Sequence, residues 1–246
     1  MKKYLILALL SIGFSAQAQN VQLHYDFGRD IYPNEEEGRQ KLTLTFEHYR
    51  PDRLGNIFYF LDLDIYSKGL KGVYLEFSRE FNIGKSGFAA HGEYNGGCTT
   101  GKGSTWASQF QHVFLVGPAY NWHNADHSLR WSLQALYKHY LKGSNGAKGY
   151  PSFQLTGVWG YTFGRDGLFT FSGYIDFWRN HVVATDTYNM IVMGEPQFWF
   201  NLNGVTRKKT NLSIGTELEF SNNFIVNGYN DKTFFVNPTL ALKWTM

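Results

Sequence analysis

Apolar and polar residues alternate along most of the chain. In 57–66, for example, Leu61 and Ile65 fall on one face, and Asp62 and Asp64 fall on the other. Because successive side chains of a strand point to opposite faces, a period of two indicates a sheet with one apolar and one polar face. The pattern recurs in 21–28, 41–49, 57–66, 73–78, 87–95, 105–121, 128–140, 150–163, 168–179, 190–202, 211–220 and 233–246.

These segments predict an all-β protein, a transmembrane antiparallel β-barrel of about 12 strands. Most of them reach the roughly 9–11 residues that a membrane-spanning strand needs, and an even strand number is usual for single-chain barrels. Short turns are expected at 51–55, 84–87, 123–127 and 164–167, and longer links at 30–39, 67–72, 96–104, 142–149, 180–189 and 222–232. Such loop asymmetry is typical of outer-membrane barrels. The alternative is a soluble secreted β-sandwich or a lipocalin-like barrel, because alternation alone does not say which face points inward.

The first 18 residues have the pattern of an export signal. Lys2 and Lys3 precede a short apolar run, and Ala16 and Ala18 supply the small residues of a cleavage site. The run is too short to span a bilayer as a helix. We therefore expect a signal peptide over 1–18, a barrel over 19–246 and an outer-membrane location, with outer-membrane lipid and the barrel-assembly machinery as partners.

Composition limits the function further. The chain is 18% aromatic and 17% charged, which argues against disorder. Its net charge of +3 is spread along the sequence, so no nucleic-acid partner is expected. Cys98 is the only cysteine, which excludes an intrachain disulfide. No spacing of residues suggests a metal site, and no cofactor is expected.

The polar face is the candidate site. It combines aromatic rings, which stack on flat heterocycles, with carboxylates, which accept hydrogen bonds from hydroxyl groups. This chemistry suits a small neutral solute such as a nucleoside, whereas the carboxylates repel phosphate. The candidate binding residues are Glu47, Phe58, Phe60, Asp62, Asp64, Tyr74, Glu76, Tyr174, Asp176 and Trp178.

Other roles are open for many of these residues. The carboxylates can instead form a structural network within the wall, with Arg79, Arg130, Lys138, Arg179 and Lys243. Aromatic residues near the strand ends suit the girdles that barrels place at the membrane interface. The candidates for these girdles are Tyr25, Tyr59, Trp122, Trp159, Trp199 and Trp244.

The segment 42–83 (LTLTFEHYRPDRLGNIFYFLDLDIYSKGLKGVYLEFSREFNI) resembles the nucleoside-specific channel-forming (Tsx-like) family of outer-membrane proteins. Segments 132–140, 153–163 and 168–178 are also similar to it. The resemblance implies a barrel of twelve strands that passes nucleosides. It further implies a binding role for Glu47, Phe58, Phe60, Asp62, Asp64 and Glu76.

Three alternative functions are open: a lipid hydrolase, a structural or surface-binding barrel, and a channel for another solute such as sugars, peptides or cations. Some outer-membrane barrels hydrolyse lipids, but Ser108 and His112 lie about 13 Å apart on one strand, too far for a hydrogen bond. The sequence also lacks the common hydrolase motifs, so we expect that the protein is not an enzyme. The second alternative is a structural or surface-binding barrel without transport, which the long links would allow.

Overall fold

The computed structural model describes residues 19–67, 69–100, 106–107, 111–143, 147–182, 185–206, 209–226 and 228–246. Almost all of the regular structure is strand. The strands are β1 (Asn20–Asp26), β2 (Leu42–Pro51), β3 (Gly55–Tyr66), β4 (Gly69–Asn82), β5 (Phe88–Thr100), β6 (Trp106–Ala107), β7 (Val113–His123), β8 (Leu129–Tyr140), β9 (Tyr150–Phe163), β10 (Phe169–Val182), β11 (Thr187–Gly194), β12 (Gln197–Asn201), β13 (Leu212–Asn222) and β14 (Phe234–Thr245). Within the described residues, three short helical turns accompany them, α2 (Gly28–Ile31), η1 (Arg165–Gly167) and α3 (Asn203–Thr206).

The strands close into an antiparallel barrel of 12 strands. Consecutive strands of the barrel wall pair with each other, and β1 pairs with β14, which closes the ring. Strands β11 and β12 both pair with β10, so they are two halves of one interrupted barrel strand. Strand β6 pairs only with β5 and lies outside the ring. Closure of the ring pairs both edges of the sheet, which lets backbone groups of the described wall hydrogen-bond within the barrel.

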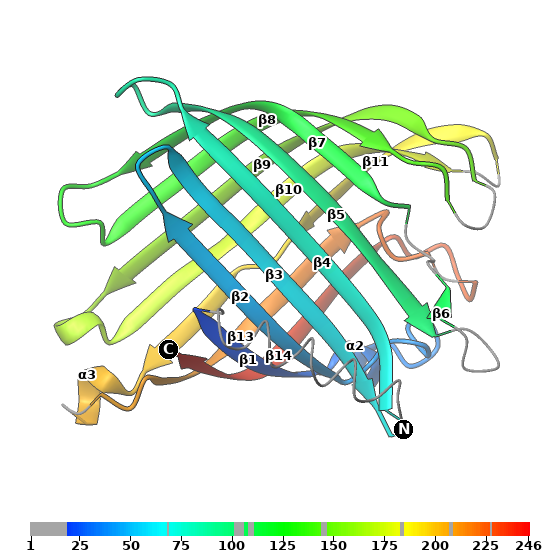
Figure 1. Cartoon of the computed structure of the whole chain (residues 1–246). Coiled ribbons are helices and arrows are strands. Elements are labelled where there is room, and N and C mark those ends of the chain that lie inside the picture. Colours follow the sequence, from blue (N-terminus) through cyan, green and yellow to red (C-terminus); the bar gives the residue numbers. More distant parts are fainter. Residues whose placement is uncertain are drawn as a thin grey trace.

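The two ends of the barrel differ. At the turn end, short connections 52–54, 83–87, 124–128 and 164–168 join the strands, together with α3, and β1 starts beside the end of β14. At the link end, the described residues of the connections are 27–41, 67, 111–112, 141–143, 147–149, 185–186, 223–226 and 228–233. Figure 1 shows the C-terminus and α3 at one end, and α2 and β6 at the other. For the described residues, the predicted segregation of short and long connections is therefore confirmed, except that β4 already starts at Gly69, within the link expected at 67–72.

The polar face points into the barrel and the apolar face points outward. On β1, Gln22 and His24 are buried, whereas Leu23 and Tyr25 are exposed on the outer surface. On β14, Asn237 is fully buried and Leu242 is 54% exposed. A soluble barrel has the opposite arrangement, so the lipocalin-like alternative does not fit. Among the described residues, no helix is long and apolar enough to cross a bilayer.

Two expectations about this wall were wrong. Trp199, a candidate for the outer girdle, lies on the inner face with none of its surface exposed. The expected strand 190–202 is interrupted at Glu195 and Pro196. There the backbone passes so close to Gly173 that a Cβ on Gly173 would lie 2.4 Å from the Glu195 carbonyl oxygen. Gly173 has a φ of +152°, which glycine adopts readily.

The strand expected at 105–121 is also different. Strand β7 begins only at Val113 and continues to His123, and β6 is a separate pair of residues. Residues 101–105 and 108–110, including Ser108, lie outside the described residues. His112 is on the outer surface, as expected, where its Nδ1 lies 2.6 Å from the Tyr94 hydroxyl oxygen.

Candidate functional site: the barrel lumen

Three predicted aromatic residues form a row on two neighbouring strands. Phe58 and Phe60 are alternate residues of β3, and their ring centroids are 6.1 Å apart. Tyr74 of β4 follows at 5.9 Å from Phe60. Each side chain is only partly buried, although it points into the barrel. The row therefore offers aromatic surface to the lumen.

Carboxylates continue this wall beside the aromatic row. Asp64 accepts a hydrogen bond from the Thr43 hydroxyl at 3.1 Å, and Asp62 accepts one from Thr45. Glu47 accepts a hydrogen bond from the Asn20 amide at 2.9 Å. A carboxylate can accept about four hydrogen bonds, so each of these groups keeps free acceptor positions.

The other predicted carboxylates lie on β4 and β10. Glu76 accepts a hydrogen bond from the Tyr74 hydroxyl at 2.7 Å. Asp176 accepts one from the Thr156 hydroxyl at 2.5 Å. Electrostatic interactions connect Glu76 with Asp176, and Asp62 with Glu195. The acidic residues of different strands therefore converge within the lumen.

Two predicted residues of β10 have different surroundings. Tyr174 is partly exposed to the lumen, and its hydroxyl interacts with Glu195. Trp178 is only 6% exposed, because the Lys138 ammonium lies 4.5 Å from its ring centroid and Phe224 packs against its edge. Trp178 therefore offers little surface for stacking and contributes mainly to the wall.

The expected basic network is present only in part. Arg130, Lys138 and Lys243 face inward, as predicted. Arg79 and Arg179 do not: Arg79 reaches Asp52 in the turn, and Arg179 stacks on Tyr188. Both side chains fall on the outer side of their strands, because their positions alternate with inward-facing residues.

The inner face carries many more acidic than basic residues. The inward carboxylates are Asp26, Glu47, Asp62, Asp64, Glu76, Glu80, Glu93, Asp176, Glu195, Glu217 and Glu219, and the inward cations are Arg39, Arg130, Lys138 and Lys243. None of the six carboxylates Glu47, Asp62, Asp64, Glu76, Asp176 and Glu195 forms an ion pair within 4.0 Å with a described Lys or Arg. The described part of the lumen is therefore electronegative.

An inward cluster on β4 and β5 was not among the candidate site residues. His91 of β5 places Nδ1 3.0 Å from Glu80 and Nε2 3.0 Å from Glu93. Glu80 also accepts hydrogen bonds from Asn56 and Asn121, which fixes this cluster near the turn end. The i, i+2 spacing of His91 and Glu93 was the available signal, since such residues share one face of a strand. No group of three or more side chains within the described ranges is arranged to hold a metal ion.

The link 27–41 folds inward at the link end. Arg39 hydrogen-bonds to Asp26 of β1 and to Glu219 of β13, with Nη2 2.8 Å from a carboxylate oxygen of each. Tyr32 packs its ring edge against Phe235, an inward and fully buried residue of β14, at a centroid distance of 5.2 Å. The link thus covers the inner faces of β13, β14 and β1 at this mouth of the barrel.

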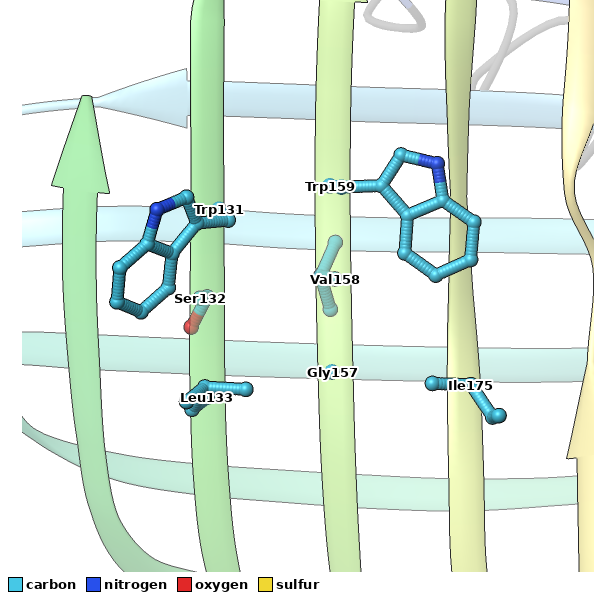
Figure 2. A pocket seen from close by; sticks show the side chains of 7 residues that line it. All are labelled: Trp131, Ser132, Leu133, Gly157, Val158, Trp159 and Ile175. Carbon is cyan, nitrogen blue, oxygen red and sulfur yellow. The ribbon is translucent and has the colours of Figure 1, made fainter. Parts of the chain in front are cut away.

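The outer surface holds one shallow apolar depression of about 350 Å³. Gly157 leaves a gap between its neighbours, and Trp131, Leu133, Trp159 and Ile175 surround it. Figure 2 shows Leu133 and Ile175 on either side of Gly157, with the Trp131 and Trp159 rings farther along the strands. The depression faces away from the lumen, so it is not part of the candidate solute site.

These features define a twelve-stranded barrel with an apolar outer wall and an acidic, aromatic lumen. The chain belongs to the family described as a domain of unknown function, DUF5020, whose family model matches residues 18–246. A search of curated proteins found no match.

Solved structures with a similar fold include two porins. The NanC porin is 9% identical with a TM-score of 0.56, and the match covers 92% of this chain and 99% of that one. The KdgM porin is 9% identical with a TM-score of 0.47, and the match covers 92% and 98%. At this level of identity the NanC similarity supports the barrel fold alone.

Proposed function

We propose that the protein is an outer-membrane channel for passive uptake of nucleosides or similar small neutral solutes. The observation that carries the proposal is the lumen wall of β3 and β4. There the aromatic row Phe58, Phe60 and Tyr74 lies beside the carboxylates Asp62 and Glu76. The fold similarity to porins and the apolar outer wall support the membrane location, where lipid and the barrel-assembly machinery would be its partners.

The aromatic and the acidic residues of this wall would bind different parts of a nucleoside. Stacking of a flat base on an aromatic ring contributes roughly 1–3 kcal/mol. The carboxylates hold open acceptor positions for sugar hydroxyls and for amino groups of a base. Binding of this modest strength suits transport, because a solute must leave the channel as readily as it enters.

Charge supplies the selectivity. The inward carboxylates repel an anion, so a nucleoside monophosphate should enter more slowly than the nucleoside. The proposal assigns no catalytic step to the lumen. On the outer surface, His112 is engaged with Tyr94, and no hydrolytic role is proposed for it.

The test is uptake into proteoliposomes that contain the refolded protein, with adenosine, adenosine monophosphate and glucose compared. We expect adenosine to enter much faster than its monophosphate. Phe60→Ala should slow adenosine uptake while leaving glucose uptake unchanged. The matched control is Phe88→Ala, because Phe88 is an aromatic residue 51% exposed on the outer surface. Equal entry of the three solutes would contradict selectivity, and no entry of any would contradict the channel.

A further inference from the structure

The inward link 27–41 contains a buried acid whose hydrogen bonding is incomplete when it is ionised. Glu36 is 5% exposed, and its Oε1 accepts a hydrogen bond at 3.0 Å from the Nδ2 amide of Asn237, an inward residue of β14. Its Oε2 is buried without a hydrogen-bond partner. The Oδ1 oxygen of Asn237 is also buried without one.

Both oxygens lie next to Gly28. A Cβ on Gly28 would be 2.6 Å from Glu36 Oε2 and 2.6 Å from Asn237 Oδ1. The carboxamide orientation is fixed, because Nδ2 also donates to Glu219 Oε1 at 3.2 Å. Two acceptors that are buried together without a donor carry a desolvation cost. A protonated Glu36 removes this cost, because its O–H can donate to Asn237 Oδ1 while its other oxygen accepts from Nδ2.

The neighbouring charges are already engaged elsewhere. Arg39 directs its donors to Asp26 and Glu219, and its Nε lies 3.7 Å from Glu36 Oε2, which is too long for a hydrogen bond. On β3, Asp64 also interacts with Arg39. Burial raises the pKa of Glu36 above its ordinary value, Arg39 and the Asn237 hydrogen bond lower it, and the carboxylates of Glu219 and Asp26 raise it.

We propose that the link 27–41 is a pH-sensitive latch at the link end of the barrel, closed by a hydrogen-bonded pair between the neutral carboxyl of Glu36 and the carboxamide of Asn237. The pKa of Glu36 is higher in the docked link than in the released link. Its neutral carboxyl therefore stabilises docking fully below the ordinary pKa of about 4.3, and this stabilisation is lost as the pH rises through the docked pKa. Between the ordinary pKa and the docked pKa, the docking constant falls by about tenfold per pH unit, and above the docked pKa it no longer changes. The latch is therefore closed in acid and released toward alkaline pH.

The test is hydrogen–deuterium exchange of the backbone amides of 28–39 in the full-length protein in detergent, corrected for intrinsic exchange rates. In the wild type, we expect protection at about pH 5 to fall at least tenfold by about pH 8. Glu36→Gln keeps both hydrogen bonds without a titrating proton, so its link should stay protected at both pH values. The matched control Glu37→Gln changes an exposed neighbour and should behave like the wild type.

A wild-type link with equal protection at both pH values would overturn the latch, and so would a Glu36→Gln link that opens as the wild type does. A second variant, Asn237→Ser, removes the carboxamide and should lose protection already at about pH 5. Retention of full protection there would also overturn the proposal. Exchange does not depend on transport, so it separates this inference from the proposed function: a protein without conductance contradicts the channel and leaves the latch intact.

Discussion

Neutralising one lumen carboxylate should change ion selectivity by an amount that depends on salt. Asp62→Asn removes one charge while its side-chain oxygen can still accept the hydrogen bond from Thr45. For an ion passing about 8 Å away in water, one charge contributes about 0.5 kcal/mol. A cation loses this attraction and an anion loses the equal repulsion, so the permeability ratio changes by about 1 kcal/mol before screening.

Screening sets the expected result. At 0.1 M salt the Debye length is about 10 Å, and Asp62→Asn should lower the cation-to-anion permeability ratio about twofold. At 0.01 M salt the Debye length is about 30 Å, and the ratio should fall about fourfold. Reversal potentials in planar bilayers under a KCl gradient measure this ratio. The control is Asp166→Asn, whose side chain is 63% exposed in a connection at the turn end. The reasoning is refuted if Asp62→Asn behaves like the control, or if the ratio rises.

Three further predictions concern the link, a turn and the wall. Gly28→Ala places a methyl group 2.6 Å from Glu36 Oε2 and Asn237 Oδ1, so the link should lose its exchange protection at about pH 5 while the barrel folds normally. Asp52→Asn should lower the thermal unfolding midpoint at neutral pH but not near pH 2, as heat-dependent gel mobility would show. Hydrogen bonds from Arg79 and from the backbone amides of Leu54 and Gly55 lower the pKa of Asp52 to about 2. The ionised carboxylate therefore stabilises the turn above its ordinary pKa of about 3.9, and this stabilisation is lost as the pH falls through about 2. Gly173→Ala should reduce the yield of the compact, refolded barrel, because its Cβ would approach the Glu195 carbonyl oxygen to 2.4 Å; a normal yield would contradict the close approach at the β11–β12 interruption.

Period-two patterning was sufficient to predict the barrel. Leu23, His24 and Asp62 could each be assigned to a face, because a strand has only two faces. An error of one residue in the register would have moved every side chain of the strand to the opposite face. The inward position of Phe58, Phe60 and Asp62 followed from the same rule. Trp199 was assigned wrongly to the membrane interface because the assignment relied on residue type. Trp199 is two residues from Gln197 on one strand, so both side chains point inward.

Contacts that join distant segments could not be predicted in this way. Arg39 reaches Glu219 across 180 residues of sequence, and Glu36 meets Asn237 across 201. Neither pair has a local signal, since the link 27–41 has no period and its inward course depends on the closed ring. Lys138 over Trp178 likewise depends on three adjacent strands, whose register only the folded sheet defines.

The central claim is that a nucleoside occupies the acidic, aromatic lumen, and block of single-channel current tests it most directly. With the refolded protein in a planar bilayer, adenosine should reduce the ion current in a concentration-dependent manner, and Phe60→Ala should weaken this block. Adenosine monophosphate at the same concentration should block much less, because the inward carboxylates repel its phosphate. A steady current that adenosine does not alter, or equal block by the monophosphate, would contradict the account.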